Sequence, residues 1–256
     1  MTRYRLTLFA LCVALPLTIL ASPTATDDAA DAFSLVSNPN GTWQYGTTGT
    51  ELGGAFSPFA NNSTNTFQNA NVSSWYGDES MFGDNFPLIG KNASTTTQNV
   101  STGDIVLRPM ELFAHPGPSG TFSVLRYTAQ GGGQYTVSGR FEGRDQRGVS
   151  TDVHVLVNSV AIASGVVNGF GAASQQWLST VITLQPGDTV DFAVGVGANE
   201  NFENDSTGIA ATVTPASGVG VPTSKDQCKD GHWQTFASPR VFKNQGDCVR
   251  FVTTGK

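Results

Sequence analysis

Apolar and polar residues alternate with a period of two in several stretches of this 256-residue chain, mostly in its second half. The alternation is clearest at 135–142, 152–157, 178–184, 190–196 and 209–213. Successive side chains of a β-strand point to opposite faces, so this pattern is typical of strands that bury one face. No stretch with a helical period separates them. The pattern therefore predicts an all-β fold, an antiparallel sandwich rather than alternating strands and helices.

Short segments rich in glycine or polar residues connect the predicted strands. The segments 131–133, 143–148 and 158–159 each fit a hairpin connection, and 186–188 fits a tight turn. Residues 46–104 are dominated by Gly, Asn, Ser and Thr, yet they also carry many aromatic residues. Because a bare polar linker does not usually contain so many aromatics, we interpret this region as several very short strands joined by loops.

The N-terminus has the features of a secretory signal. Two arginines precede an apolar run at 6–20, which Pro16 interrupts and which is too short to span a bilayer comfortably. Small residues follow, and cleavage after Ala21 or after Ala25 would fit. We expect residues 1–25 to be removed during export and the remainder to be secreted, with no membrane insertion.

The expected mature chain is acidic. Removal of residues 1–25 takes away two of the 14 basic residues and none of the 20 acidic residues, which leaves a net charge of −8. Nucleic acids and anionic membranes attract basic surfaces, so the charge disfavours both as partners.

Two cysteines remain once Cys12 leaves with the signal. In an exported chain, Cys228 and Cys248 most simply form one disulfide, which stabilises the segment by about 3 kcal/mol. A zinc site is the alternative, but His232 is the one further ligand nearby in the sequence.

The composition of the chain changes after residue 214. Residues 215–223 are rich in Pro, Gly, Ser and Val, as a linker is, and residues 224–256 contain both remaining cysteines. So short a segment cannot bury much core alone, so we expect the disulfide to order it. The sequence thus divides into a signal at 1–25, a sandwich domain at 26–214, the linker and a disulfide-stapled C-terminal segment.

Four residues with ionisable side chains form a candidate ligand-binding group. Asp152 and His154 alternate with valines on one predicted strand, so their side chains share a face, and His115 and Asp145 could join them in space. Two imidazoles with carboxylates could hold a metal, or one carboxylate could orient a histidine. The alternative is a solvent-side hydrogen bond between polar groups of neighbouring strands.

A structural calcium ion is a second hypothesis, because Ca²⁺ takes several oxygen ligands from loops. Glu203 and Asp205 in the loop at 199–208 are the candidate metal ligands, and Asp145 with Glu142 is another candidate pair. Neither group has the regular acidic spacing of a calcium-binding loop, so an ordinary polar loop is the alternative.

Three aromatic residues are candidate platforms for a sugar ring. Trp75, Tyr76 and Trp177 lie among Gly, Asn and Ser residues, and an exposed aromatic face can stack on a pyranose. In the alternative, Trp177 begins a core strand and Trp75 closes the end of the sandwich. A Gly-X-Ser-X-Gly elbow and a His-Glu-X-X-His motif are missing, and no spacing supports Glu142 and Asp191 as a glycosidase pair. An enzyme is therefore disfavoured.

The region 112–214 resembles the galactose-binding-like jelly-roll modules of exported bacterial proteins, as seen in many carbohydrate-binding modules. The matching segments are SVLRYTA at 123–129, GQYTV at 133–137, TDVHVLVN at 151–158, VITLQPGDTVDFAV at 181–194 and DSTG at 205–208. This resemblance implies a jelly-roll sandwich that binds a carbohydrate or a cell-surface glycan without catalysis. An extracellular structural or matrix protein that binds other proteins is the alternative, and a polysaccharide hydrolase or lyase is the third hypothesis.

The C-terminal segment resembles a short segment appended to many exported bacterial proteins. The matching stretches are SKDQCKDGHW at 224–233 and FKNQGDCV at 242–249. The resemblance supports export and implies no specific activity.

Overall fold

The computed structural model describes residues 26–130, 132–215, 222, 224–229, 233, 236 and 240–256. The predicted signal, most of the predicted linker and His232 lie outside these residues. Within them, the chain forms two large antiparallel sheets that enclose a common core, so the predicted β-sandwich is confirmed. Among the described helices, none is long and apolar enough to cross a membrane.

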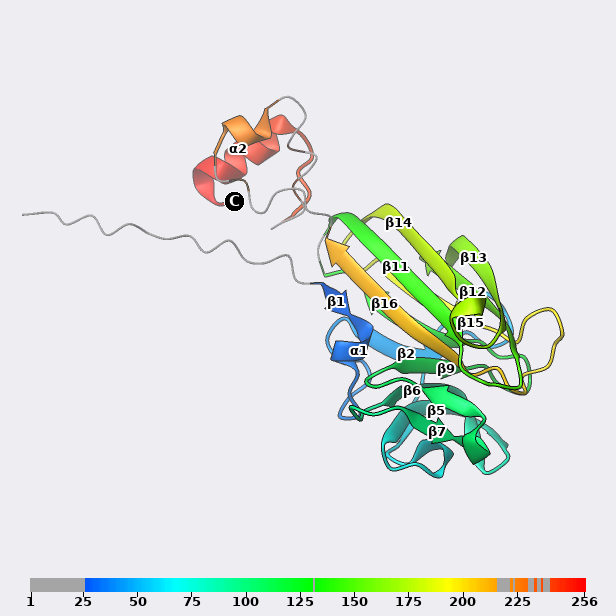
Figure 1. Ribbon diagram of the computed structural model, residues 1–256. Coiled ribbons are helices and arrows are strands. Elements are labelled where there is room, and N and C mark those ends of the chain that lie inside the picture. Colours follow the sequence, from blue (N-terminus) through cyan, green and yellow to red (C-terminus); the bar gives the residue numbers. More distant parts are fainter. Residues whose placement is uncertain are drawn as a thin grey trace, which may run out of the picture.

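The first sheet, sheet A, is eight-stranded and antiparallel. Its strand order is β14 (Gln176–Leu184), β11 (Gly133–Gly143), β16 (Thr207–Pro215), β9 (Leu112–His115), β6 (Asp84–Asn92), β5 (Val72–Met81) and β4 (Asn61–Ser63), and β1 (Asp27–Asp28) pairs with β16. In Figure 1 these strands follow one another from β14 at the top to β5 near the bottom. Sheet A therefore joins the well-patterned half of the sequence to the polar region before it.

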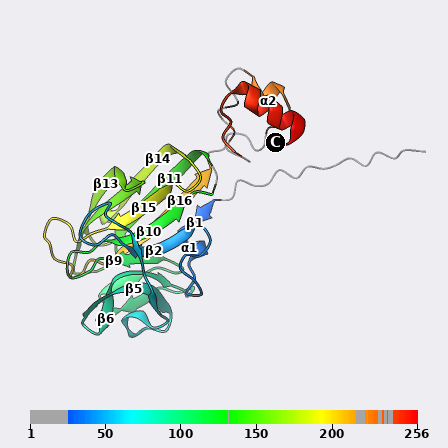
Figure 2. The same ribbon diagram turned by 180° about the vertical axis from the view of Figure 1, so that it is seen from behind.

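The second sheet, sheet B, is six-stranded. Its order is β13 (Val160–Gly169), β12 (Val149–Val157), β15 (Thr189–Val194), β10 (Ser123–Thr128), β2 (Trp43–Thr47) and β3 (Ser57–Pro58). Figure 2 shows β15, β10 and β2 in succession across this sheet. A small ladder of β7 (Gln98–Val100) and β8 (Ile105–Leu107) lies outside both sheets.

Short helical segments lie between the strands and in the C-terminal unit. They are α1 (Ala29–Ala32), η1 (Thr66–Gln68), η2 (Ser101–Gly103), η3 (Gly171–Ser174), η4 (Asp226–Cys228) and α2 (Gln245–Thr254). Asp28 caps α1 by accepting hydrogen bonds from Ala30 N and Asp31 N. Helices thus contribute little to the sandwich itself.

The core between the sheets consists of the inward residues of the alternating strands. In β11, Tyr135, Val137 and Phe141 are buried, whereas Thr136, Ser138 and Arg140 between them are partly exposed. Trp43 from β2 and Phe192 from β15 are fully buried, with ring centroids 6.0 Å apart. The period of two in the sequence therefore separates the core face from the solvent face.

The connections between the strands differ from the sequence prediction in two of three cases. Asn158 and Ser159 form a two-residue hairpin turn between β12 and β13, with φ values of 48° and 69°. The segments at 131–133 and 143–148 were predicted to be hairpins, but they join strands of different sheets. Alternation shows which face of a strand is buried, but not which strand pairs with it.

The polar region at 46–104 contains longer strands than its sequence suggests. β3, β4 and β7 are short, as predicted, but β5 has 10 residues and β6 has 9. These two strands form a hairpin that closes at Phe82 and Gly83, both with positive φ. The pairing of β6 with β9 joins this hairpin to sheet A and extends the sheet well beyond the predicted strands.

The described C-terminal residues form a small unit around the predicted disulfide. Cys228 and Cys248 are bonded, with a Cα–Cα distance of 5.8 Å. Both are buried with Phe236 and Phe242 in a cluster that Phe251 contacts. The predicted disulfide is confirmed.

Candidate ligand-binding site

A cavity of about 560 Å³ lies among loops that come from distant parts of the sequence. The turn of the β5–β6 hairpin, η1 and η2 contribute to its wall. The end of β9, the connection from β11 to β12 and the loop before β16 complete it. Concave sites of this size, formed by loops on a rigid sheet scaffold, are where small ligands usually bind.

The backbone around this cavity adopts unusual conformations. Ten described residues other than glycine have positive φ, and six of them line the cavity. They are Phe67, Gln68, Phe82, Ser101, Thr102 and Asn204, with φ between 51° and 68°. Such conformations cost energy for residues with a Cβ atom and gather at binding sites. Their concentration here supports a functional role for the cavity.

Aromatic rings form one part of the cavity wall. Phe82 is 73% exposed and lies parallel to Phe202, with centroids 6.2 Å apart and planes 8° apart. Phe86 meets the edge of Phe202 at 5.5 Å. An exposed ring at the mouth with further rings behind it offers flat apolar surface to a ligand.

His115 lines the same cavity and is buried, at 5% exposure. Its Nδ1 lies 2.9 Å from the carbonyl oxygen of Pro116. A carbonyl oxygen only accepts hydrogen bonds, so Nδ1 carries the proton and Nε2 is left as an acceptor. Burial lowers the pKa of His115 to about 4, so the ring is neutral near pH 7. Its packing against Phe86, at 4.7 Å, adds to the aromatic wall.

Carboxylates supply the polar part of the wall. Asp84, Asp145 and Glu203 all line the cavity. Burial raises the pKa of Asp84 and of Asp145, although a backbone N–H bonded to each carboxylate acts in the opposite direction. Of the predicted binding residues, the structure thus places His115 and Asp145 at one cavity, together with Glu203, a predicted metal ligand.

Asp152 and His154 lie apart from the cavity lining, although they do share a face. His154 Nε2 lies 2.7 Å from Asp152 Oδ2, and His154 Nδ1 lies 2.8 Å from the hydroxyl of Ser164 on the neighbouring strand. Asp152 Oδ1 accepts a hydrogen bond from Gly197 N at 2.8 Å. This is a cross-strand polar contact, the alternative to the predicted ligand group. The predicted group of four therefore divides between two places.

The structure places the three candidate sugar platforms in different environments. Trp75 is 5% exposed, packs in the main core and donates from Nε1 to the Ser34 carbonyl oxygen at 2.8 Å. Tyr76 is partly buried against a neighbouring apolar cluster. Trp177 is 61% exposed. Trp75 is thus buried, whereas Trp177, which the alternative places in a core strand, is exposed.

The residues present do not fit a calcium ion at Glu203 and Asp205. Asp205 is fully buried, and its Oδ1 accepts from Ser150 N at 3.0 Å. Its Oδ2 accepts no hydrogen bond from the described residues, and Glu203 is exposed rather than beside it in the interior. Among the described residues, no group of three His, Cys, Asp or Glu side chains is placed to hold a metal. The calcium hypothesis is therefore carried no further.

The carboxylates considered as a glycosidase pair are held in ion pairs. Glu142 is 2% exposed and contacts Arg108 at 2.6 Å and Arg144 at 3.0 Å. Asp191 forms a two-point contact with Arg126, at 2.7 Å for both oxygens. These arginines hold both carboxylates in place through charge-assisted hydrogen bonds, which is a structural role.

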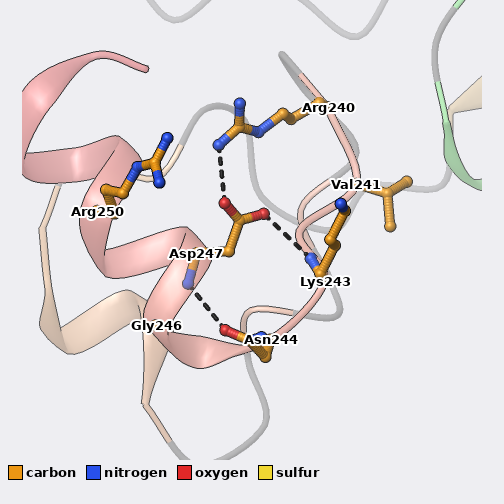
Figure 3. Close-up of a pocket in the computed structure, with 7 residues that line it drawn as sticks. All are labelled: Arg240, Val241, Lys243, Asn244, Gly246, Asp247 and Arg250. Atoms are coloured by element: carbon orange, nitrogen blue, oxygen red, sulfur yellow. Dashed lines mark hydrogen bonds and ion pairs between the residues drawn. The ribbon is translucent and has the colours of Figure 1, made fainter.

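A second cavity, of about 520 Å³, lies in the C-terminal unit. Figure 3 shows the Asp247 carboxylate at its centre, accepting from Arg240 at 3.0 Å and from Lys243 N at 3.2 Å, while Asn244 caps the Asp247 N–H at 2.9 Å. The central charge is thus already paired within the chain. This arrangement explains how α2 begins, and we do not assign a ligand to it.

Sequence reasoning missed the aromatic residues of the first cavity. Phe82, Phe86 and Phe202 carry no motif, and they come from segments more than a hundred residues apart. A local signal was Phe82 directly before Gly83, because a bulky residue beside a turn glycine is uncommon, although the sequence alone does not mark the flanking segments as a hairpin.

Comparison with known proteins gives only weak likenesses. No protein-family model and no curated protein matches the chain. Among solved structures, a family 51 carbohydrate-binding module from Clostridium perfringens, in complex with methyl-galactose, is 15% identical, covering 62% of this chain and 94% of its own, with a TM-score of 0.33.

Two further likenesses are of the same order. A family 35 carbohydrate-binding module from Clostridium thermocellum is 15% identical over 40% of this chain and 76% of its own, with a TM-score of 0.28. Rabbit GITRL is 14% identical over 34% and 68%, with a TM-score of 0.21. The chain is thus similar to carbohydrate-binding modules, but TM-scores this low carry no argument, and the fold class rests on the strands described above.

Proposed function

We propose that the chain is a secreted, noncatalytic carbohydrate-binding module, and that the sugar occupies the cavity beside Phe82. The single observation that carries the proposal is the wall itself. Flat aromatic rings from Phe82 and Phe202 stand beside hydrogen-bond acceptors from His115 and Asp145. A sugar ring needs both, because its C–H faces stack on aromatics while its hydroxyls donate to polar groups.

Other features of the chain agree with an extracellular function. The Cys228–Cys248 disulfide is stable in an oxidising compartment, and residues 1–25 have the features of an export signal. The acidic domain disfavours nucleic acid as the ligand.

Binding of the mature chain to a panel of immobilised neutral, amino and acidic glycans tests this function. Replacing Phe82 by Ala removes the exposed ring and should weaken binding about tenfold. Phe170→Ala is the matched control, because Phe170 is also exposed, at 41%, and does not line the cavity. A wild-type chain that binds no glycan, or equal losses in both variants, would refute the proposal.

A protein-binding role is the second candidate, favoured by one observation. Exposed apolar side chains gather on β13 and β14, including Val166 at 57%, Trp177 at 61% and Val181 at 59%. Scattered apolar residues are normal on a surface, but several on two adjacent edge strands can form a contact surface. Loss of partner capture by Trp177→Ala, with glycan binding absent from the wild type, would favour this role.

A further inference from the structure

The charged groups at the cavity are mostly negative. Asp84, Asp145 and Glu203 line it, and Arg147 is the one cation among the lining residues. The Arg147 guanidinium already contacts Asp104 at 2.6 Å. The lining therefore holds three carboxyl groups and one guanidinium group, and that guanidinium group is paired with Asp104.

Two of these carboxylates have an oxygen without a donor. Phe67 N–H donates to Asp84 Oδ1 at 3.1 Å, and Arg147 N–H donates to Asp145 Oδ1 at 2.9 Å. Neither Oδ2 atom accepts a hydrogen bond from the described part of the chain. Asp145 is only 4% exposed, so its carboxylate lies in a confined part of the cavity wall. A ligand that brings donors and positive charge would supply both oxygens with a partner.

The aromatic wall suits the same kind of ligand. The exposed face of Phe82 carries negative charge density, which attracts a cation placed over it, and the buried rings of Phe86 and Phe202 pack behind it. His115 is neutral and offers Nε2 as an acceptor, so it does not repel a positive group. Carboxylates and rings together therefore favour a ligand with an ammonium group.

Other charge classes fit the lining less well. A uronic acid or a sulfated sugar would bring negative charge to a wall that already holds three carboxylates. A neutral sugar would leave those carboxylates uncompensated. We propose that the ligand is an amino sugar with a free ammonium group, an inference that rests on the sugar-binding function proposed above.

Two oligosaccharides of equal length test this proposal, β-1,4-linked glucosamine and its N-acetylated form. Their binding to the mature chain is measured by calorimetry at neutral pH and about 0.15 M salt, where remote charges are screened. We expect the amine form to bind about tenfold more tightly, in line with a desolvated cation–carboxylate and cation–π contact. Asp145→Asn should abolish this preference while changing the affinity for the acetylated form little.

Two further variants keep the test decisive. Glu203→Gln removes a lining charge at an exposed position, where the substitution should not disturb folding. It therefore tests the role of charge in ligand preference even if Asp145→Asn does not fold. Glu51→Gln is the control, because it removes one exposed negative charge that is not at the cavity. The preference for the amine form over the acetylated form should be smaller in Glu203→Gln and unchanged in Glu51→Gln.

The possible results separate the two proposals. Equal or tighter binding of the acetylated form would overturn the amino-sugar proposal and leave carbohydrate binding in place. Failure of every glycan in the panel to bind would overturn the proposed function itself. Equally tight binding of a polyamine without a sugar would show that charge alone is recognised, which also overturns the amino-sugar proposal.

Discussion

The sandwich and the C-terminal unit of this chain differ both in how they are ordered and in charge. Residues 26–214 carry 6 basic and 17 acidic residues, whereas residues 224–256 carry 6 basic and 3 acidic residues. The sandwich has a continuous core of large side chains between two sheets. The described part of the C-terminal unit has a small cluster centred on Cys228 and Cys248. A large domain can depend on hydrophobic burial alone, but a short segment needs a covalent constraint.

The largest effect expected in this comparison comes from the sandwich core. Phe192 is fully buried between the sheets, so Phe192→Ala should lower the free energy of unfolding by about 3–5 kcal/mol, through lost burial and the cavity left behind. Urea denaturation followed by tryptophan fluorescence measures this. Val181→Ala, at an exposed site, should change stability by less than about 0.5 kcal/mol. A small effect at Phe192 would mean that the sandwich does not depend on this core.

The next effect concerns the disulfide. Replacing both Cys228 and Cys248 by Ser should destabilise the C-terminal unit by about 3 kcal/mol, because the unfolded segment regains the freedom that the bond removed. Limited proteolysis should then cut within residues 224–256, while the urea midpoint of the sandwich stays unchanged. Uncut protein, or a lower sandwich midpoint, would show that the two regions are not ordered independently in this way.

The smallest effect is a pH dependence confined to the sandwich. Burial raises the pKa of Asp205 to about 7, so the folded state binds a proton that the unfolded state releases near pH 4. Stability should therefore fall as the pH rises from 4 to 7. Asp205→Asn should be about 2 kcal/mol more stable than the wild type at pH 8 and similar to it near pH 4.

Thermal denaturation of both proteins across this pH range measures the difference. The described residues of the C-terminal unit include no fully buried carboxyl group like that of Asp205. The protease resistance of this unit should therefore not change with Asp205→Asn. A difference in stability that is constant with pH would contradict the raised pKa of Asp205.

Much of the fold was predictable, whereas little of the cavity was. The strand at 135–142 was visible because it buries alternate residues, and that requirement is local. The strand at 190–196 was visible from the same alternation in sequence, although the structure ends β15 at Val194 and buries every residue from Val190 to Val194. The pairing of β5 and β6 was not visible, because their sequences are polar and interrupted by glycine. Local sequence also does not show which strands pair, so residues 131–133 resembled a hairpin connection although they lie between strands of two different sheets.

The candidate site shows this limit most clearly. His115 and Asp145 were selected for their chemistry, and both line the cavity, but Asp152 and His154 were grouped with them and lie elsewhere. Trp75 was selected for its residue type and is in the core. Residue type and spacing indicate what a side chain can do, but its exposure depends on which segments cover it.

By itself, the sequence determined the positions of the main strands, the disulfide between Cys228 and Cys248, and the acidic charge of the domain. These properties depend on neighbours in the chain, on residue counts or on a single pair of cysteines. The tertiary structure alone decided that Phe82, His115, Asp145 and Phe202 surround one cavity. These residues come from separate connections, and only the stacking of two sheets brings the ends of those connections together.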